Sequence, residues 1–268
     1  MEIATITIET LKQMFAEGKR FDGRKLDEYR PLTLSFDVSN KAEGSARVLL
    51  GNTDVVAGVK LGLGEPYPDS PDKGNLVVSA ELIPLASPRF EGGPPNFESI
   101  ELARLVDRVI RESSMIDLSK LVITPGEKVW NIFVDIYPIN DDGNLIDAAT
   151  IAAVAALKKA KIPVLDKDGK IDYEKESKEL LPVFKEILPL SISFFKLGSS
   201  IVMDPTREEE EAMETRITLG ASFWEKQFMI NACQKSGKSP LTRKEFELII
   251  NSLQSKYLEL NERLKKFF

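Results

Sequence analysis

The sequence predicts an α+β protein made of two halves, each a sheet covered by helices. Strand-like runs and amphipathic helices follow one another without a regular βαβ rhythm, which argues against a doubly wound sheet. The 268 residues suffice for one large or two moderate domains, and 43% hydrophobic with 29% charged residues is typical of a globular chain. A polar, charged stretch separates the halves. We therefore expect an N-terminal helix and arm at 1–30, a first domain at 31–165, a linker at 166–188 and a second domain at 189–268.

The first half should combine helices with a strand-rich sheet. Residues 7–17 predict an amphipathic helix whose inward side carries Leu11, Met14 and Phe15. Runs rich in β-branched and apolar residues predict strands at 31–38, 45–51, 54–62, 76–86, 120–126 and 128–139. The tight turn at 51–53 joins two of these strands as a hairpin. Helices are expected at 100–113 and 147–161. The latter is apolar nearly all round and should be buried, with Asp147 capping its amino end.

The linker and the second half follow a similar pattern. We expect a short helix at about 174–184, a hairpin at 190–204 that turns near Gly198, and strands at 215–222 and 226–233. A long amphipathic helix at about 242–266 closes the chain, with large apolar residues along one side.

The composition excludes several classes of chemistry. The chain has no histidine, which rules out a Ser-His-Asp triad, histidine-ligated zinc and histidine acid–base catalysis. The single cysteine, Cys233, rules out an internal disulfide and fits a reducing cytoplasm. A net charge of −6 provides no general attraction to nucleic acid, so any such contact must be local. No signal peptide opens the chain and the apolar run at 148–157 is too short to span a bilayer, so we expect a cytoplasmic protein without membrane contact.

The predicted helix at 100–113 carries an arginine column on its exposed face. Arg104, Arg108 and Arg111 lie on the side opposite an apolar stripe made of Ile100, Leu102, Leu105, Val106 and Val109. One interpretation is that the arginines only pair with Glu101, Asp107 and Glu112, at about 0.2–0.5 kcal/mol for each pair. The other is that they bind a polyanion, because arginine grips phosphate better than lysine does. The pattern alone leaves both interpretations open.

Three further motifs are weaker. The "SGKS" at 236–239 resembles the end of a phosphate-binding loop, but Ala232 stands where that loop needs a glycine, so an ordinary loop is favoured. The "GLG" at 62–64 lacks the third glycine of a dinucleotide fingerprint. The acidic run at 204–214 has the ligand type that magnesium prefers, yet a solvated loop is the more typical structure for such a run.

Four segments resemble the RNase PH superfamily of phosphate-dependent 3′-to-5′ exoribonucleases and their exosome relatives. They are "RFDGRKLDEYRPL" (20–32), "EGSARVLLGNTDVVAGV" (43–59), "IELARLVDRVIRES" (100–113) and "DGNLIDAATIAAVAAL" (142–157). The stretches at 63–76 and 91–108 bring the chain closer to the archaeal exosome ring, and to the non-catalytic of its two kinds of subunit. The resemblance implies two RNase PH-like domains with the ribosomal protein S5 domain 2-like fold.

The departures from the family pattern concern the catalytic positions. The arginine that grips phosphate in active members aligns with Ile146, and the neighbouring Asp147 would bring a negative charge to the anion site. Of the family's acidic pair, the first position aligns with Glu210 and the second with Arg216, which can neither hold magnesium nor donate a proton. The segment 90–100 lacks a further family arginine. The resemblance therefore implies no catalytic residue, metal ligand or cofactor in this chain, with inorganic phosphate and magnesium acting at a partner's site.

The resemblance implies a function in RNA degradation without catalysis. Three copies would each pair with a catalytic RNase PH-like subunit in a hexameric ring, to which RNA-binding cap subunits bind. The chain would order the partner's active site and help bind single-stranded RNA through Arg104, Arg108 and Arg111. Within that column, Arg104 and Arg108 would face the RNA, whereas Arg111 would be held by Asp107 or the interface. The alternatives are that the chain is itself a phosphate-dependent 3′-to-5′ exoribonuclease, or a pure ring scaffold without RNA contacts.

Overall fold

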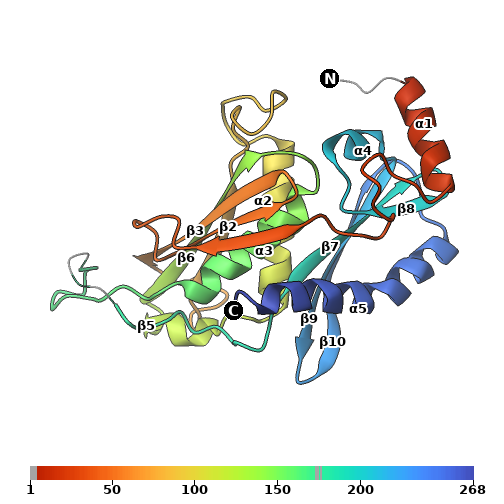
Figure 1. Ribbon diagram of the computed structural model, residues 1–268. Coiled ribbons are helices and arrows are strands. Elements are labelled where there is room, and N and C mark those ends of the chain that lie inside the picture. The colour runs from red at the N-terminus through yellow and green to blue at the C-terminus, as the bar shows by residue number, and fades with distance from the viewer. Residues whose placement is uncertain (1–4, 173–174, 176) are drawn as a thin grey trace.

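Two β-sheets lie side by side in the computed structural model, which describes residues 5–172, 175 and 177–268 (Figure 1). Each sheet is covered by helices, and the predicted α+β class with two sheet-and-helix units is confirmed. None of the helices among the described residues is long and apolar enough to cross a membrane.

The first sheet is antiparallel except at one edge. Its strands are β1 (Leu32–Phe36), β2 (Gly44–Leu50), β3 (Thr53–Gly64), β4 (Asn75–Ala80), β5 (Val122–Thr124) and β6 (Lys128–Asn140). The order is β1-β2-β3-β6-β4, with β4 parallel to β6 and the short β5 pairing with the end of β6. The predicted hairpin of β2 and β3 is present and pairs Leu50 with Thr53. A short 3₁₀ helix, η1 (Leu118–Leu121), precedes β5.

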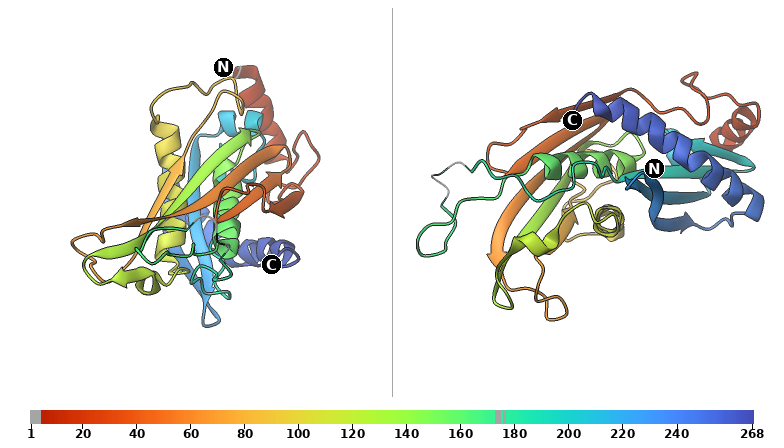
Figure 2. Two further views of the ribbon diagram at one scale, coloured as in Figure 1. Left: turned by 90° about the vertical axis from the view of Figure 1, so that its left-hand side faces the viewer. Right: turned by 90° about the horizontal axis from the view of Figure 1, so that it is seen from below.

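The second sheet is fully antiparallel. Its strands are β7 (Leu190–Leu197), β8 (Ser200–Met203), β9 (Thr215–Trp224) and β10 (Gln227–Gly237), in the order β10-β9-β7-β8. The predicted turn near Gly198 joins β7 to β8, with the glycine in the left-handed region. Helix α5 (Arg243–Lys265) crosses from this sheet toward the first one (Figure 2). Its C-terminal end reaches β1, where the rings of Phe268 and Phe36 meet edge to face.

Helix α3 (Leu145–Lys159) packs on β2 and β3 of the first sheet and on β7 of the second. Its small alanines allow this close packing, and a Cβ added at Gly44 would collide with the carbonyl oxygen of Ala156. The prediction that this helix is buried is therefore confirmed. Helix α2 (Phe97–Glu112) packs against β4, α3 and β10, so both helices contact the two sheets. Helices α1 (Thr5–Ala16) and α4 (Arg207–Ala212) form a smaller apolar cluster beside β8.

Three predicted element boundaries are wrong. The expected strand at 76–86 ends at Ala80, because the chain turns over 81–86 and Pro84 cannot donate to a ladder. Asp147 does not cap α3, because the helix begins at Leu145 and Asn144 occupies the cap position. Ile100, expected on the buried stripe of α2, is 48% exposed, because the buried side of the helix turns away from it.

The short helix expected at 174–184 is also wrong for the residues that the structure describes. Positions 174 and 176 lie outside the described residues, whereas 177–184 run without helical structure and make isolated bridges to the first domain. Leu180 pairs with Lys161, and Val183 pairs with Ile116. Burial of Leu181 against the first domain stabilises this extended path.

A buried carboxylate, Asp204, holds the two sheets and the N-terminal arm together. Its oxygens accept hydrogen bonds from the Arg30 backbone N–H at 2.7 Å, the Arg30 guanidinium at 2.8 and 2.9 Å, and Arg24 Nη1 at 3.2 Å. The side-chain amide of Asn144 adds a further bond at 3.0 Å. Nearby, Arg20 forms a buried ion pair with Glu209 of α4. A buried ion pair is costly to break, because the remaining partner is left charged without solvent.

We expect Asp204→Ala to lower the free energy of unfolding by about 3–5 kcal/mol, because Arg30 would stay buried without its counter-charge. Urea denaturation of the full chain measures this. Glu247→Ala is the matched control, because it removes an exposed ion pair with Arg243 that contributes at most about 1 kcal/mol. Asp204→Asn keeps the size and one acceptor and should fall between the two. Equal losses for Asp204→Ala and the control would contradict this account.

Candidate functional site

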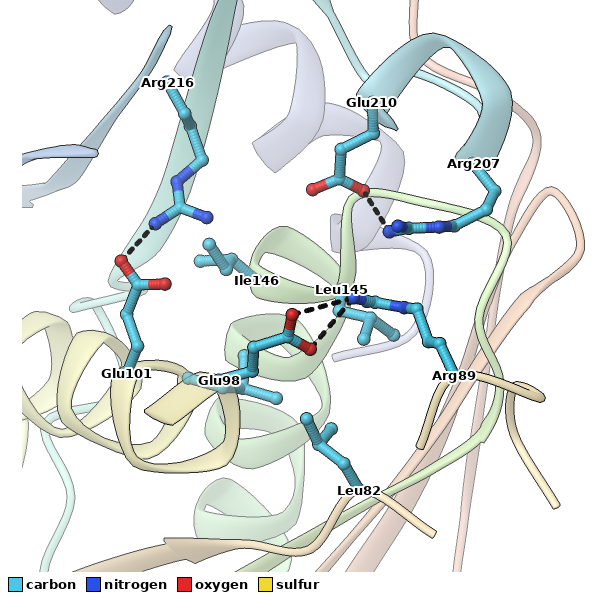
Figure 3. A pocket seen from close by; sticks show the side chains of 10 residues that line it. Leu82, Arg89, Glu98, Glu101, Leu145, Ile146, Arg207, Glu210 and Arg216 are labelled. Atoms are coloured by element: carbon cyan, nitrogen blue, oxygen red, sulfur yellow. Dashed lines mark hydrogen bonds and ion pairs between the residues drawn. The ribbon is translucent and has the colours of Figure 1, made fainter. Parts of the chain in front are cut away.

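A cleft lies where the N-terminal ends of α2 and α3 meet α4 and β9 (Figure 3). Its lining consists of Leu82, Arg89, Glu98, Glu101, Leu102, Leu145, Ile146, Arg207, Glu210 and Arg216. The three positions that depart from the family pattern, Ile146, Glu210 and Arg216, therefore share one cleft although they come from three different elements. The grouping of these positions into one site is confirmed.

The charges in the cleft neutralise one another. Arg216 Nη2 lies 2.7 Å from Glu101 Oε1, and Arg89 Nη1 lies 2.9 and 3.0 Å from the oxygens of Glu98 (Figure 3). Arg207 lies 3.8 Å from Glu210. Each arginine that lines the cleft thus has a carboxylate of the same cleft beside it. Little positive charge is left to attract a phosphate.

The amino end of α3 is occupied by a carboxylate of the chain itself. The backbone N–H of Asn144 donates to Glu210 Oε2 at 2.9 Å. Helix amino ends attract anions because their first N–H groups lack partners within the helix. Burial raises the pKa of Glu210, while Arg207 opposes that shift. An anion from solution would have to displace this carboxylate, and the apolar Ile146 beside it offers no hydrogen bond.

Asp147 does not line the cleft, contrary to our expectation. Its carboxylate is fully buried and accepts hydrogen bonds from Tyr29 Oη at 3.0 Å, Asn144 Nδ2 at 3.1 Å and the Ser193 N–H and Oγ at 3.2 and 2.8 Å. Burial raises the pKa of Asp147 to about 6, although the hydrogen bonds oppose the shift. The negative charges in the cleft come instead from Glu98, Glu101 and Glu210.

Sequence reasoning missed Arg89 and Arg207. We found no arginine within 90–100, but Arg89 stands one residue before that segment and reaches the cleft, where Glu98 and Asp141 bind it. Widening the segment by one residue would have found it. Arg207 was hidden in the acidic run at 204–214. That run is not the solvated loop we expected, because it contains α4, which begins with a capping box of Thr206 and Glu209.

The remaining motifs are structural in the part of the chain that is described. The "SGKS" at 236–239 spans the end of β10 and the loop before α5, where the favoured interpretation placed it. The described residues contain no group of three or more acidic or cysteine side chains placed to hold a metal ion.

The arginine column lies on the exposed face of α2, and its members differ in their partners. Arg111 pairs with Asp107 at 2.6 and 3.0 Å and donates to the Leu76 carbonyl at 2.9 Å, so the expected contact with Asp107 is confirmed. For Arg104 and Arg108, no hydrogen bond or ion pair forms with any described residue. The pair that Arg104 could make with Glu101 is absent because Glu101 turns into the cleft and binds Arg216. The interpretation that helix pairs neutralise the whole column is therefore wrong for Arg104 and Arg108.

Comparison with known families places the chain. The 3′ exoribonuclease family (RNase PH) matches with its domain 1 at residues 28–163 and with its domain 2 at residues 188–251. The chain belongs to this family. The matched segments contain the first sheet with α2 and α3, and the second sheet with the start of α5. The expected RNase PH fold is confirmed.

Close relatives are archaeal exosome components. The exosome complex component Rrp42 of Methanothermobacter thermautotrophicus is 44% identical over 265 residues, which cover 98% of this chain and 96% of the relative. Its counterpart in Archaeoglobus fulgidus is 48% identical over 250 residues, 93% of this chain and 92% of the relative.

Solved structures agree with these sequence relationships. A chain of the Archaeoglobus fulgidus exosome with RNA bound to the active site superposes with a TM-score of 0.86 at 45% identity, over 97% of this chain and all of the other. A chain of an archaeal exosome core superposes with a TM-score of 0.81 at 42% identity, over 97% of both. These relationships confirm the resemblance to the non-catalytic kind of archaeal exosome ring subunit.

Asp147 should make the stability of this family member depend on pH. Its pKa of about 6 in the folded chain lies above the ordinary 3.8, so the folded chain keeps a proton between pH 4 and 6 that the unfolded chain has lost. The contribution of this carboxyl to stability therefore falls as pH rises through that range, by about 3 kcal/mol in total. Urea denaturation of wild type and Asp147→Asn at pH 4, 5, 6 and 7 measures it.

Wild type should gain stability relative to Asp147→Asn as pH falls from 7 to 4, because the variant carries no titrating group at this position. Paired carboxylates elsewhere lose stability in acid equally in both proteins. Asp69→Asn, at an exposed loop position, should track wild type at every pH. A pH-independent difference between wild type and Asp147→Asn would contradict the burial argument.

Proposed function

We propose that this chain is a non-catalytic subunit of an archaeal exosome core ring. In this proposal it orders the active site of a catalytic RNase PH-like partner and guides single-stranded RNA along α2. One observation carries the proposal: Arg104 and Arg108 are exposed and unpaired among the described residues, whereas the arginines that line the cleft are bound to glutamates. The chain thus offers positive charge on its outer helix and withholds it from the cleft.

The chemistry of phosphorolysis supports a non-catalytic role. Phosphoryl transfer depends on positive groups that stabilise charge around the transferred phosphate. In this cleft, Glu101 and Glu98 bind Arg216 and Arg89, and Glu210 takes the amino end of α3. Inorganic phosphate and magnesium would act at the partner's site, and this chain itself would need no cofactor.

The outer face of α2 suits a nucleic-acid backbone. Arg104 and Arg108 are one helical turn apart, which separates their Cα atoms by about 6 Å along the axis. Guanidinium groups at that spacing can donate to neighbouring phosphates without reading bases. In the proposed ring of three heterodimers, α2 lies at the junction with the partner, and cap subunits deliver the RNA. Arg111 supports the column through Asp107 and contributes less to binding.

A charge reversal on α2 tests the RNA contact. We expect Arg104→Glu with Arg108→Glu, placed in a ring reconstituted with an archaeal catalytic subunit, to weaken oligoadenylate binding by about tenfold to a hundredfold. Fluorescence anisotropy at several salt concentrations measures the affinity. The slope of log K against log salt should fall by about 1.4, because about 0.7 is lost for each phosphate contact on a single strand. The size of the ring, from native mass spectrometry, should not change.

Arg243→Glu is the matched control, because this arginine is exposed on α5 and paired only with its helix neighbour Glu247. It should leave RNA affinity within about twofold of wild type, since surface pairs contribute little. Unchanged RNA affinity in the Arg104 and Arg108 variant would mean that the chain is a scaffold without RNA contacts.

The enzyme alternative makes a different prediction. We expect this chain alone to release no nucleoside diphosphates from oligoadenylate and phosphate, because its cleft contains no unpaired arginine. Mixed with an archaeal catalytic subunit, it should raise the rate above that of the subunit alone. Chromatographic detection of adenosine diphosphate measures both. Phosphate-dependent release by the chain alone, retained in Arg104→Glu with Arg108→Glu, would establish the enzyme alternative.

A further inference from the structure

The exposed face of α2 continues beyond the arginines as an apolar stripe. Phe97, at the first helical position, is 76% exposed, and Ile100, almost one turn later, is 48% exposed. With 100° between successive residues, Phe97 and Ile100 lie within about 40° of Arg104 around the helix axis. A phenylalanine exposed to this degree on a helix with a well-packed opposite side has no role in this chain's core.

A second exposed aromatic residue lies at the other end of the column. Tyr67 is 50% exposed and belongs to the loop that connects β3 to β4. Arg111 donates to the carbonyl of Leu76 in β4, which places the C-terminal end of the column beside this part of the sheet. Hydrogen bonding to Asp107 raises the pKa of Arg111, and Tyr67 lies close enough to add to that shift. Aromatic side chains thus flank the arginines over a helix length of about 21 Å from Phe97 to Arg111.

We propose that this face binds single-stranded RNA through its bases as well as its phosphates, with Phe97 and Tyr67 stacking on bases at the two ends of the Arg104–Arg108 segment. The inference rests on the proposed function and deepens it. Aromatic rings interleaved with cationic groups are the usual platform for single strands, because every base has a π face and every linkage a negative charge. Such a surface distinguishes nucleic acid from other polyanions without preferring a sequence.

The charges of the helix favour RNA over a protein partner as the occupant. The acids that could neutralise Arg104 from the same helix are engaged elsewhere, since Glu98 binds Arg89 and Glu101 binds Arg216. Covering Phe97 with an apolar protein surface would leave two unpaired guanidinium groups at the edge of a dry interface, which is costly. A strand of nucleotides supplies stacking surface and negative charge in alternation, which matches the order of residues along the helix.

The experiment compares two probes on the same reconstituted ring: an oligoadenylate, and an abasic ribose-phosphate oligomer of equal length. Phe97→Ala and Tyr67→Ala should each weaken oligoadenylate binding by about fivefold to a hundredfold, the range for loss of one stacked base. Both should leave binding of the abasic oligomer unchanged. Phe97→Leu, which keeps apolar bulk without a ring, should behave as Phe97→Ala does, whereas Phe97→Trp should retain wild-type affinity.

The two proposals fail in different ways. If Arg104→Glu with Arg108→Glu weakens binding of both probes while Phe97→Ala and Tyr67→Ala change neither, base stacking is overturned and the RNA path remains. If the arginine variant changes neither probe, the RNA path itself is overturned. Equal loss of both probes in Phe97→Ala, or dissociation of the ring that Phe97→Leu repairs, would identify Phe97 as a residue of the protein interface and overturn the stacking proposal.

Discussion

The arrangement of this molecule depends on the buried carboxylate of Asp204. It accepts hydrogen bonds from two arginines of the N-terminal arm and from Asn144 at the start of α3. The close approach of Pro205 requires Gly143, since a Cβ there would lie 2.6 Å from the Pro205 carbonyl oxygen. Because charged groups buried in this way must all be satisfied at once, the second sheet can dock on the first in only one position. That position brings α4 and β9 to the amino ends of α2 and α3.

The cleft that results is a competition between charges, and its outcome determines what the outer helix can do. Arg216 on β9 binds Glu101, and Glu101 would otherwise lie three residues before Arg104 on the same helix. The residue that replaces an acidic position of active family members therefore has two effects. It removes a possible magnesium ligand from the cleft, and it leaves Arg104 without its intrahelical partner. Loss of catalysis and gain of an available arginine are physically linked in this chain.

Buried polar groups around α3 show the same economy. Glu210 satisfies the Asn144 N–H at the helix start, while Asp147 is satisfied by Tyr29 and Ser193 on neighbouring elements. Each carboxylate fills a place that a solvent anion or water would otherwise take. Such self-satisfied sites are stable and chemically quiet, which suits a subunit whose proposed contribution is a surface for RNA and not a reaction.

The sequence by itself determined the class of fold, most elements and the family. Period-two runs located the β2–β3 hairpin, apolar periodicity located α2 and α5, and local motifs at 142–157 and 100–113 were sufficient for the RNase PH resemblance. It also identified Ile146, Glu210 and Arg216 as a single site, although only through comparison with a family pattern. These features depend on neighbours along the chain or on motifs that a linear pattern contains.

Only the tertiary structure decided the partners of the charges. Sequence spacing offered Glu101 to Arg104, but the docking of β9 gave it to Arg216. The same docking placed Arg89 in the cleft, removed Asp147 from it and turned the acidic run into α4. The linker at 177–184 runs extended instead of helical because its apolar residues bury against the first domain. Ion pairs and burial depend on distances through space between residues that are remote in sequence, and periodicity along the chain does not contain those distances.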